Sequence, residues 1–149
     1  MVKTGNSLVV IPTYNESLNI TRTIDQVLKV PNLDILIVDD GSPDGTGKIA
    51  DQISEKNSRV NVLHRSEKSG LGTAYKQGFT WGIDNGYENL IEMDCDGSHP
   101  ASQLPQMLKL LEDNELVIGS RYIPGGRTEN WPLSRRLLSK GANIYANLL

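Results

Sequence analysis

The stretch "DILIVDD" (residues 34–40) is an unbroken apolar run that ends in two aspartates. Apolar runs without polar alternation are typical of strands that are covered on both faces, as in parallel sheets. A similar run, "SLVVIP", occupies residues 7–12. Between the two lies "SLNITRTIDQVLKV" (17–30), whose apolar residues recur at helical spacing. These 34 residues therefore predict a strand, a helix and a second strand that is parallel to the first.

The same alternation continues along the chain. It predicts further strands at residues 60–65, 87–94 and 115–120 and further helices at residues 44–56, 71–86 and 101–114. Ser17 or Asn15 is expected to cap the first helix, Asp44 to be the N-cap residue of the second in a turn with Gly45, and Gly86 to close the third. The predicted fold class is α/β: a three-layer αβα sandwich of the doubly wound type, with a mainly parallel central sheet.

Length and composition favour one ordinary globular domain. The chain has 149 residues, of which 38% are hydrophobic and 22% charged, so a disordered chain is excluded. A single cysteine, Cys95, rules out an internal disulfide and fits a reducing compartment. The N-terminal apolar stretch is too short for a signal peptide, and no run of about 18 apolar residues occurs that could span a membrane.

Charge is distributed unevenly along the chain. Residues 1–120 hold 10 Lys or Arg against 17 Asp or Glu, a balance of −7, whereas residues 121–149 hold 5 against 1, a balance of +4. A basic end on an acidic body suggests an anionic partner there, either phosphates or an anionic lipid surface. An ordinary solvated basic helix explains the charge equally well.

Polar clusters follow each predicted strand. They are "PTYNE", "DDGSPDG", "HRSEKSG", "DCDGSH" and "SRYIPGGR". Parallel strands bring their carboxyl ends to one edge of the sheet, which is where ligands bind in open α/β sheets. The sequence therefore predicts one site built from these turns.

Several familiar motifs fail on spacing or composition. "GSPDGTGK" (41–48) has the wrong glycine spacing for a phosphate loop, and "GTG" lacks the third glycine of a dinucleotide fingerprint. A calcium loop from Asp94 would need glycine where His99 stands, and zinc would need more ligands than Cys95 and His99. Asp94 and Asp96, by contrast, suit a hard ion such as Mg²⁺ or Mn²⁺ held together with substrate phosphates.

Nucleophilic catalysis is disfavoured. The serines lack the Gly-X-Ser-X-Gly elbow, and carboxylates on both sides of Cys95 disfavour its thiolate. A base role for His99 stays open beside the more common situation, in which a turn histidine caps the following helix.

The turns taken together resemble family 2 glycosyltransferases of the GT-A fold, and most of all polyprenol-phosphate mannose synthases (dolichol-phosphate mannosyltransferases). The resemblance rests on "VVIPTYNE", "IVDDGSPDGT", "GLGTAY", "EMDCDGSHP", "GSRYIPGG" and "NWPLSRRLLSKGAN", which run in family order from residue 8 to residue 143. It implies an inverting transfer of mannose from GDP-mannose to a polyprenyl phosphate, with Mg²⁺ or Mn²⁺ as cofactor.

The resemblance also implies roles for particular residues. The nucleotide pocket would be lined by Pro12, Tyr14 and Glu16, with Val38 and Asp40 beside the guanosine. Asp94 and Asp96 would hold the metal and the donor, with the Cys95 backbone alongside. Arg121 and Arg135 would meet the donor diphosphate or the acceptor phosphate, and Lys140 is a further candidate for that role. Many relatives have a metal-binding Gln where this chain has Ser98, which is shorter, so that a water could intervene.

Residues 1–132 are predicted to form the catalytic domain and residues 133–149 a basic amphipathic helix. One face of that helix carries Leu137, Leu138, Ala142, Tyr145, Leu148 and Leu149. Such a helix suits a lipid surface, which implies a peripheral protein on the cytoplasmic face of a membrane. Packing on a partner, or on a further segment of the kind that family members have after "SKGAN", is the alternative.

Two other functions stay open. One is a transferase of the same fold that uses another donor, such as UDP-glucose. The other is a non-catalytic domain that only binds a nucleotide sugar. No nucleic-acid partner is expected.

Overall fold

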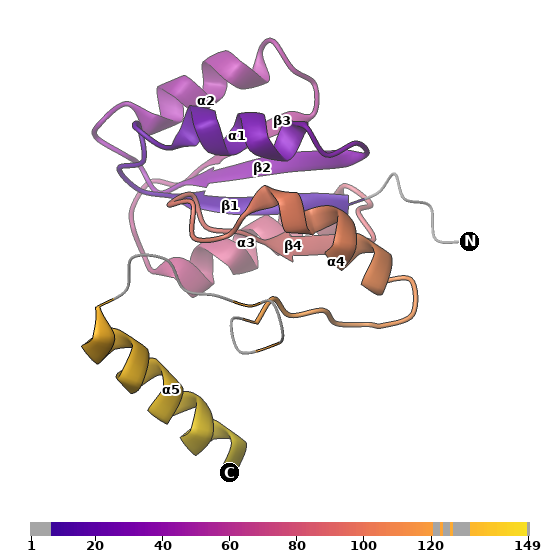
Figure 1. Cartoon of the computed structure of the whole chain (residues 1–149). Coiled ribbons are helices and arrows are strands. Elements are labelled where there is room, and N and C mark those ends of the chain that lie inside the picture. Colours follow the sequence, from indigo (N-terminus) through magenta and orange to yellow (C-terminus); the bar gives the residue numbers. More distant parts are fainter. Residues whose placement is uncertain (1–6, 121–122, 124–125, 127–131, 149) are drawn as a thin grey trace. The chain divides into compact units, whose positions relative to one another are not determined.

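The computed structural model describes residues 7–120, 123, 126 and 132–148, and the chain divides into two compact units, Met1–Glu115 and Leu116–Leu149. The first unit contains β1 (Ser7–Thr13), α1 (Ile20–Leu28), β2 (Leu33–Asp39), α2 (Thr46–Ser54), β3 (Val60–His64), α3 (Leu71–Asp84), β4 (Asn89–Glu92), the 3₁₀ helix η1 (Ala101–Gln103) and α4 (Leu104–Leu110) (Figure 1). The second unit contains α5 (Leu133–Leu148).

The four strands form one parallel sheet in the order β3-β2-β1-β4. Successive strands step outward from β1 to β3, and the chain then returns to the other side of β1 to form β4. The order reverses at β1, which makes the gap between the ends of β1 and β4 the switch point of the sheet.

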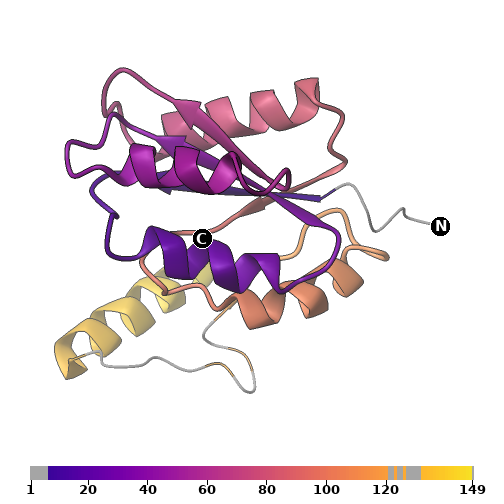
Figure 2. The same ribbon diagram turned by 90° about the horizontal axis from the view of Figure 1, so that it is seen from above.

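Alternate residues of each strand feed two separate cores. Val9, Ile11, Ile35 and Ile37 pack against α1, α2, η1 and α4, while Leu8, Val10, Leu36 and Val38 pack against α3. Figure 2 shows α3 on one side of the sheet and α1 with α4 on the other. The predicted three-layer α/β architecture is confirmed, and the apolar runs of β1 and β2 reflect their burial on both faces.

The first helix begins later than its sequence pattern predicts. Asn15 takes a positive φ of 62°, and the N–H groups of Asn19 and Ile20 both donate to the carbonyl of Glu16 at 2.9 Å. A turn therefore precedes α1, Asn19 stands at the cap position, and the predicted capping by Ser17 or Asn15 is wrong. The C-terminal end of α3 agrees with prediction. Gly86 has a φ of 80° and its N–H donates to the carbonyl of Ile83, which closes the helix.

The predicted fifth strand is also wrong. Residues 115–120 are described and contain no strand. Leu116 and Ile118 are each 74% exposed. An apolar run becomes a strand only where its backbone groups pair with a neighbour and its side chains are covered.

Candidate functional site

The carboxyl ends of the four strands bring four of the five predicted clusters to one edge of the sheet. The fifth, "SRYIPGGR" (120–127), belongs to the second unit and lies mostly outside the described residues. The register sets Pro12 beside Val38 and Thr13 beside Asp39, which in turn pairs with His64. On the other side of β1, the N–H of Met93 donates to the carbonyl of Val10 at 3.2 Å, just before the acidic turn. The turns after β1 and β4 therefore flank the switch point.

Asp94 is tied down from two directions. Its Oδ1 accepts a hydrogen bond from the Tyr75 hydroxyl at 3.1 Å, and its own N–H donates to Nδ1 of His99 at 3.1 Å. His99 Nε2 lies 3.9 Å from Asp94 Oδ2. His99 thus closes the acidic turn on itself, and the expectation that it caps the following helix is wrong, because its ring nitrogen is engaged by the Asp94 backbone.

Asp96 is exposed and its charge is stabilised locally. Hydrogen bonds from the hydroxyl and the N–H of Ser98 lower the pKa of Asp96 below its usual value, and the N–H contact to Oδ1 measures 2.8 Å. Gly97 between them has a φ of 79°, which glycine adopts at no steric cost. Asp96 is therefore ionised at neutral pH at the mouth of the turn.

These two carboxylates fit a hard divalent cation. The part of the chain that the structure describes has no group of three or more His, Cys, Asp or Glu side chains able to hold a metal. Mg²⁺ typically takes one or two carboxylates and completes its shell with substrate phosphates and waters. Asp94 and Asp96 match that requirement, and a direct bond from Ser98 to a metal stays a prediction.

Cys95, between the two aspartates, is built into the core. The residue is 3% exposed, and burial, together with the negative charges of nearby carboxylates, raises the pKa of its thiol to about 11. This agrees with the expectation that the thiol is a poor nucleophile. The Cys95 carbonyl accepts a hydrogen bond from the Thr23 hydroxyl of α1 at 3.0 Å, which fixes the acidic turn to that helix.

The turns after β1 and β2 interlock. Three N–H groups of the first turn donate to side chains of the second: Asn15 to Ser42 Oγ (3.0 Å), Glu16 to Thr46 Oγ1 (2.9 Å) and Ser17 to Asp44 Oδ2 (3.0 Å). Asp44 also accepts from the N–H of Thr46, the first residue of α2, at 3.0 Å. Hydrogen bonds from the Thr46 hydroxyl and from the N–H groups of Ser17 and Thr46 hold the pKa of Asp44 well below its usual range. Asp44 and Gly45 form the turn that opens α2, as predicted, but Gly45 and not Asp44 is the N-cap residue.

The residues expected to bind the nucleotide lie in different environments. Tyr14 is 37% exposed, and Lys68 Nζ lies 4.2 Å from the centre of its ring, which is a cation–π contact. Pro12 and Glu16 are half-buried at the same strand end. Val38 is wholly buried against α3 and has no exposed surface. The nucleotide-binding roles of all four remain predictions.

Asp40 is buried and paired. Arg65 Nη1 donates to Asp40 Oδ1 at 2.7 Å, and Arg65 Nη2 donates to Thr73 Oγ1 at 2.9 Å and to the Ser69 hydroxyl. Asp40 thus follows directly after β2, where it was expected, and its carboxylate is paired with the Arg65 guanidinium. Its predicted position beside the guanosine is untested.

Sequence reasoning missed three residues that shape the site: Thr23, Arg65 and Tyr75. Each donates a hydrogen bond across 19 to 72 residues of sequence. One sequence signal could have pointed to Tyr75. It lies on the same face of α3 as Ala74, Gly78 and Gly82, and a helix face made of such small residues packs closely on a sheet.

The basic residues that were predicted to bind phosphate groups, Arg121, Arg135 and Lys140, belong to the second unit. Arg121 lies outside the described residues, and Arg135 lies in α5 with a side chain that is not described. Lys140 is exposed on α5, as are Leu133, Leu137, Leu138, Ile144 and Tyr145. Among the described helices, no helix is both long and apolar enough to cross a membrane.

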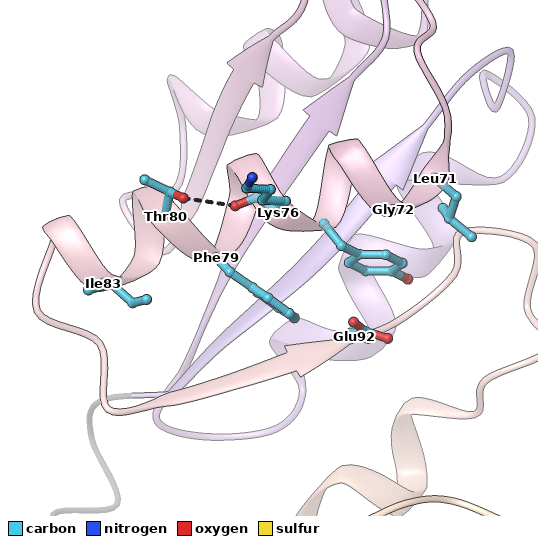
Figure 3. Close-up of a pocket in the computed structure, with 8 residues that line it drawn as sticks. Leu71, Gly72, Lys76, Phe79, Thr80, Ile83 and Glu92 are labelled. Carbon is cyan, nitrogen blue, oxygen red and sulfur yellow. Dashed lines mark hydrogen bonds between the residues drawn. The ribbon is translucent and has the colours of Figure 1, made fainter.

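A hollow of about 530 Å³ lies between α3 and β4. Figure 3 shows Phe79 pointing from α3 toward the strand that carries Glu92, with Leu71 and Ile83 at the two ends of the helix. Tyr75, the residue that bonds to Asp94, also lines this hollow. Tyr75 therefore contacts both the hollow and the acidic turn.

Comparison with known proteins gives consistent results. The family model described as "Glycosyl transferase family 2" matches residues 8–148. The chain is 48% identical to an undecaprenyl-phosphate mannosyltransferase of Micrococcus luteus, over 95% of this chain and 59% of the relative. It is 49% identical to a polyprenol monophosphomannose synthase of Mycolicibacterium smegmatis, over 98% of this chain and 56% of the relative. The chain thus spans less than two thirds of the length of these relatives.

The fold also has a solved counterpart. A mannosyltransferase from Pyrobaculum calidifontis, in complex with GDP-Man and Mn²⁺, matches with a TM-score of 0.65 and 21% identity. The match covers 78% of this chain and 36% of the other. It confirms the predicted GT-A arrangement of the sheet and its flanking helices.

Proposed function

The chain belongs to glycosyltransferase family 2, and on that basis we propose that it transfers mannose from GDP-mannose to a polyprenyl phosphate, with inversion at the anomeric carbon. The names of the relatives support both the mannosyl group and the lipid phosphate. The product is a polyprenyl-phosphate mannose.

One observation carries the proposal: Asp94 and Asp96 stand at the switch point of the sheet, in a turn fixed on both sides. Tyr75 holds the Asp94 carboxylate, and Thr23 holds the intervening carbonyl of Cys95. An α/β sheet binds its ligand at this place. When bound, Mg²⁺ or Mn²⁺ supplies positive charge that stabilises the departing diphosphate.

Other residues of the chain orient the donor. Pro12, Tyr14 and Glu16 lie at the end of the neighbouring strand and are assigned to the nucleotide. Tyr14 already makes a contact with a cation, Lys68, which extends positive charge toward that end of the sheet. Val38 and Asp40 lie at the end of β2 that is assigned to the guanosine, where wholly buried Val38 supports the strand end from within. The Cys95 backbone and Ser98 are assigned to the donor beside the metal.

The acceptor explains why the site needs no general base. A phosphate monoester has a second pKa of about 6, so it is largely a dianion at neutral pH and attacks without losing a proton to the protein. Arg121, Arg135 and Lys140 are assigned to the donor diphosphate or the acceptor phosphate, because guanidinium and ammonium groups bind such oxygens strongly. Their task is to neutralise charge and to align the acceptor.

We place the protein at the cytoplasmic face of a membrane as a peripheral protein. Support comes from α5, where Lys140 and large apolar side chains are exposed together: Leu133, Leu137, Leu138, Ile144 and Tyr145. That composition suits the boundary between lipid headgroups and acyl chains, where a polyprenyl chain is also found.

The test is direct. The chain is incubated with GDP-mannose, Mn²⁺ and a short polyprenyl phosphate, and the lipid fraction is examined for mannose. Asp96→Ala should abolish transfer, because it removes a metal and donor ligand, whereas Asp25→Ala, an exposed carboxylate on α1, should leave it unchanged. Full activity of Asp96→Ala would refute the assignment.

The same assay separates the alternatives. Transfer from UDP-glucose in place of GDP-mannose would identify another donor. Tight binding of GDP-mannose by calorimetry, with no lipid-linked product, would identify a domain that only binds the nucleotide sugar.

A further inference from the structure

Tyr75 connects the far layer of the fold to the acidic turn. It lies on α3, is 8% exposed, and places its hydroxyl 3.1 Å from Oδ1 of Asp94. α3 covers the face of the sheet opposite to α1, so the acidic turn is held from both layers: by Thr23 through the Cys95 carbonyl and by Tyr75 through the Asp94 carboxylate.

The position of Tyr75 is fixed by its helix. Gly78 lies one turn further along, and a Cβ there would stand 2.4 Å from Cγ1 of Val10. The backbone of α3 therefore packs directly against side chains of β1, without space for even a methyl group at Gly78. Tyr75 also packs on Phe79, with 6.0 Å between the ring centres.

The hydrogen bond divides the two oxygens of Asp94. Oδ1 accepts from Tyr75, whereas Oδ2 lies 3.9 Å from Nε2 of His99, beyond hydrogen-bond range. A tyrosine hydroxyl is a donor at neutral pH. The carboxylate is therefore held in one rotation about its terminal bond, with Oδ2 left for a ligand. Hydrogen bonds of this kind orient metal-binding carboxylates and tune their affinity.

We propose that Tyr75 is a positioning residue that orients the Asp94 carboxylate for a divalent cation bound together with a nucleoside diphosphate. The inference rests on the proposed function, because it takes Asp94 as a metal ligand. Tyr75 itself touches neither the cation nor the reacting atoms; its effect passes through Asp94.

A matched pair of variants tests this. Tyr75→Phe removes only the hydroxyl, and Tyr87→Phe removes an equivalent hydroxyl that donates to Asp34 Oδ2 at 2.8 Å, at the start of β2 and so at the opposite edge of the sheet. Mn²⁺ binding to the 149-residue chain is measured by electron paramagnetic resonance in the presence of GDP. We expect about ten-fold weaker Mn²⁺ binding for Tyr75→Phe and no change for Tyr87→Phe.

A second measurement separates positioning from folding. Activity of Tyr75→Phe should return toward that of the original chain as the Mn²⁺ concentration rises, because a weakened site can be saturated. Thermal melts of both variants check that they fold alike. Failure of saturating Mn²⁺ to restore activity would assign Tyr75 a structural role and overturn the inference.

The outcomes distinguish the two proposals. Equal Mn²⁺ affinity of Tyr75→Phe and the original chain overturns the positioning role and leaves the proposed function standing. An original chain that binds no Mn²⁺ with GDP overturns both.

Discussion

At the scale of single residues, Asp40 and Arg65 form the least exposed ion pair of the described residues, with side chains 7% and 5% exposed. Removing two charges from water costs several kcal/mol each, and the attraction offsets this only where geometry is good and remaining hydrogen-bonding groups are satisfied. Arg65 meets that condition, since its second terminal nitrogen donates to Ser69 and Thr73. The pair therefore joins the ends of β2 and β3 to the start of α3.

Arg65→Met should be strongly destabilising. The variant keeps most of the side-chain volume but leaves the Asp40 carboxylate buried without its partner, and breaking a buried pair in this way costs about 3–5 kcal/mol. Urea unfolding monitored by circular dichroism measures the change. The double variant with Asp40→Asn no longer buries a lone charge and should recover part of the loss. A cost below about 1 kcal/mol for the single variant would mean that water reaches Asp40.

Residue identities at the site were predictable where the chemistry is local in sequence. Asp94 and Asp96 are separated by one residue and follow a predicted strand, so both their chemistry and their edge of the sheet could be predicted. Tyr75 and Arg65 could not be found in that way, because their role is to contact a carboxylate from another element. The residues adjacent to them in sequence do not specify that contact.

At the scale of elements, α3 shows how small residues set a distance. The face of α3 that packs on the sheet carries Ala74, Gly78 and Gly82, and a Cβ at either glycine would collide with a side chain of the sheet. Glycine lowers helix stability by about 1 kcal/mol relative to alanine. Close packing on β1 outweighs that cost, and it is what brings the Tyr75 hydroxyl within reach of Asp94.

Gly78→Ala should therefore destabilise the fold even though alanine is the better helix former. The new methyl group would lie 2.4 Å from Val10 Cγ1 and 3.2 Å from Val38 Cγ2, both wholly buried. Overpacking of this kind costs about 1–3 kcal/mol. Gly72→Ala in the same helix meets nothing within 4 Å and should be neutral or stabilising by up to about 1 kcal/mol. Thermal melts compare the two, and equal melting temperatures would show that α3 moves away from the sheet at little cost.

The elements themselves were predictable to different degrees. The strands of the sheet could be predicted from continuous apolar runs, because both of their faces are buried. The helices between them could be predicted from apolar residues at helical spacing, because only one face is buried. The start of α1 depends on the left-handed conformation of Asn15, and the absence of a strand at residues 115–120 depends on what the run pairs with. Neither is encoded in hydrophobic periodicity.

At the scale of the whole molecule, the charge asymmetry agrees with the division into two units. Residues 1–120 carry 10 basic against 17 acidic side chains and residues 121–149 carry 5 against 1, while the structural division falls between Glu115 and Leu116. Every residue of the two described core clusters lies between Leu8 and Leu108. The packing that holds the sheet and its helices together therefore belongs to the first unit.

A chain shortened to residues 1–115 should accordingly unfold in one cooperative transition, at a melting temperature within a few degrees of the 149-residue chain. It keeps both core clusters, and a chain of this length can bury enough apolar surface to fold without a disulfide or a metal. A chain ending at residue 99 is the matched control: it lacks Ala101 and Leu104, each 4% exposed, and should melt lower, since burying one leucine contributes about 1.5–3 kcal/mol. Differential scanning calorimetry measures all three chains. A gradual transition for residues 1–115 would mean that the fold also needs residues 116–132, as the predicted domain boundary after residue 132 implies.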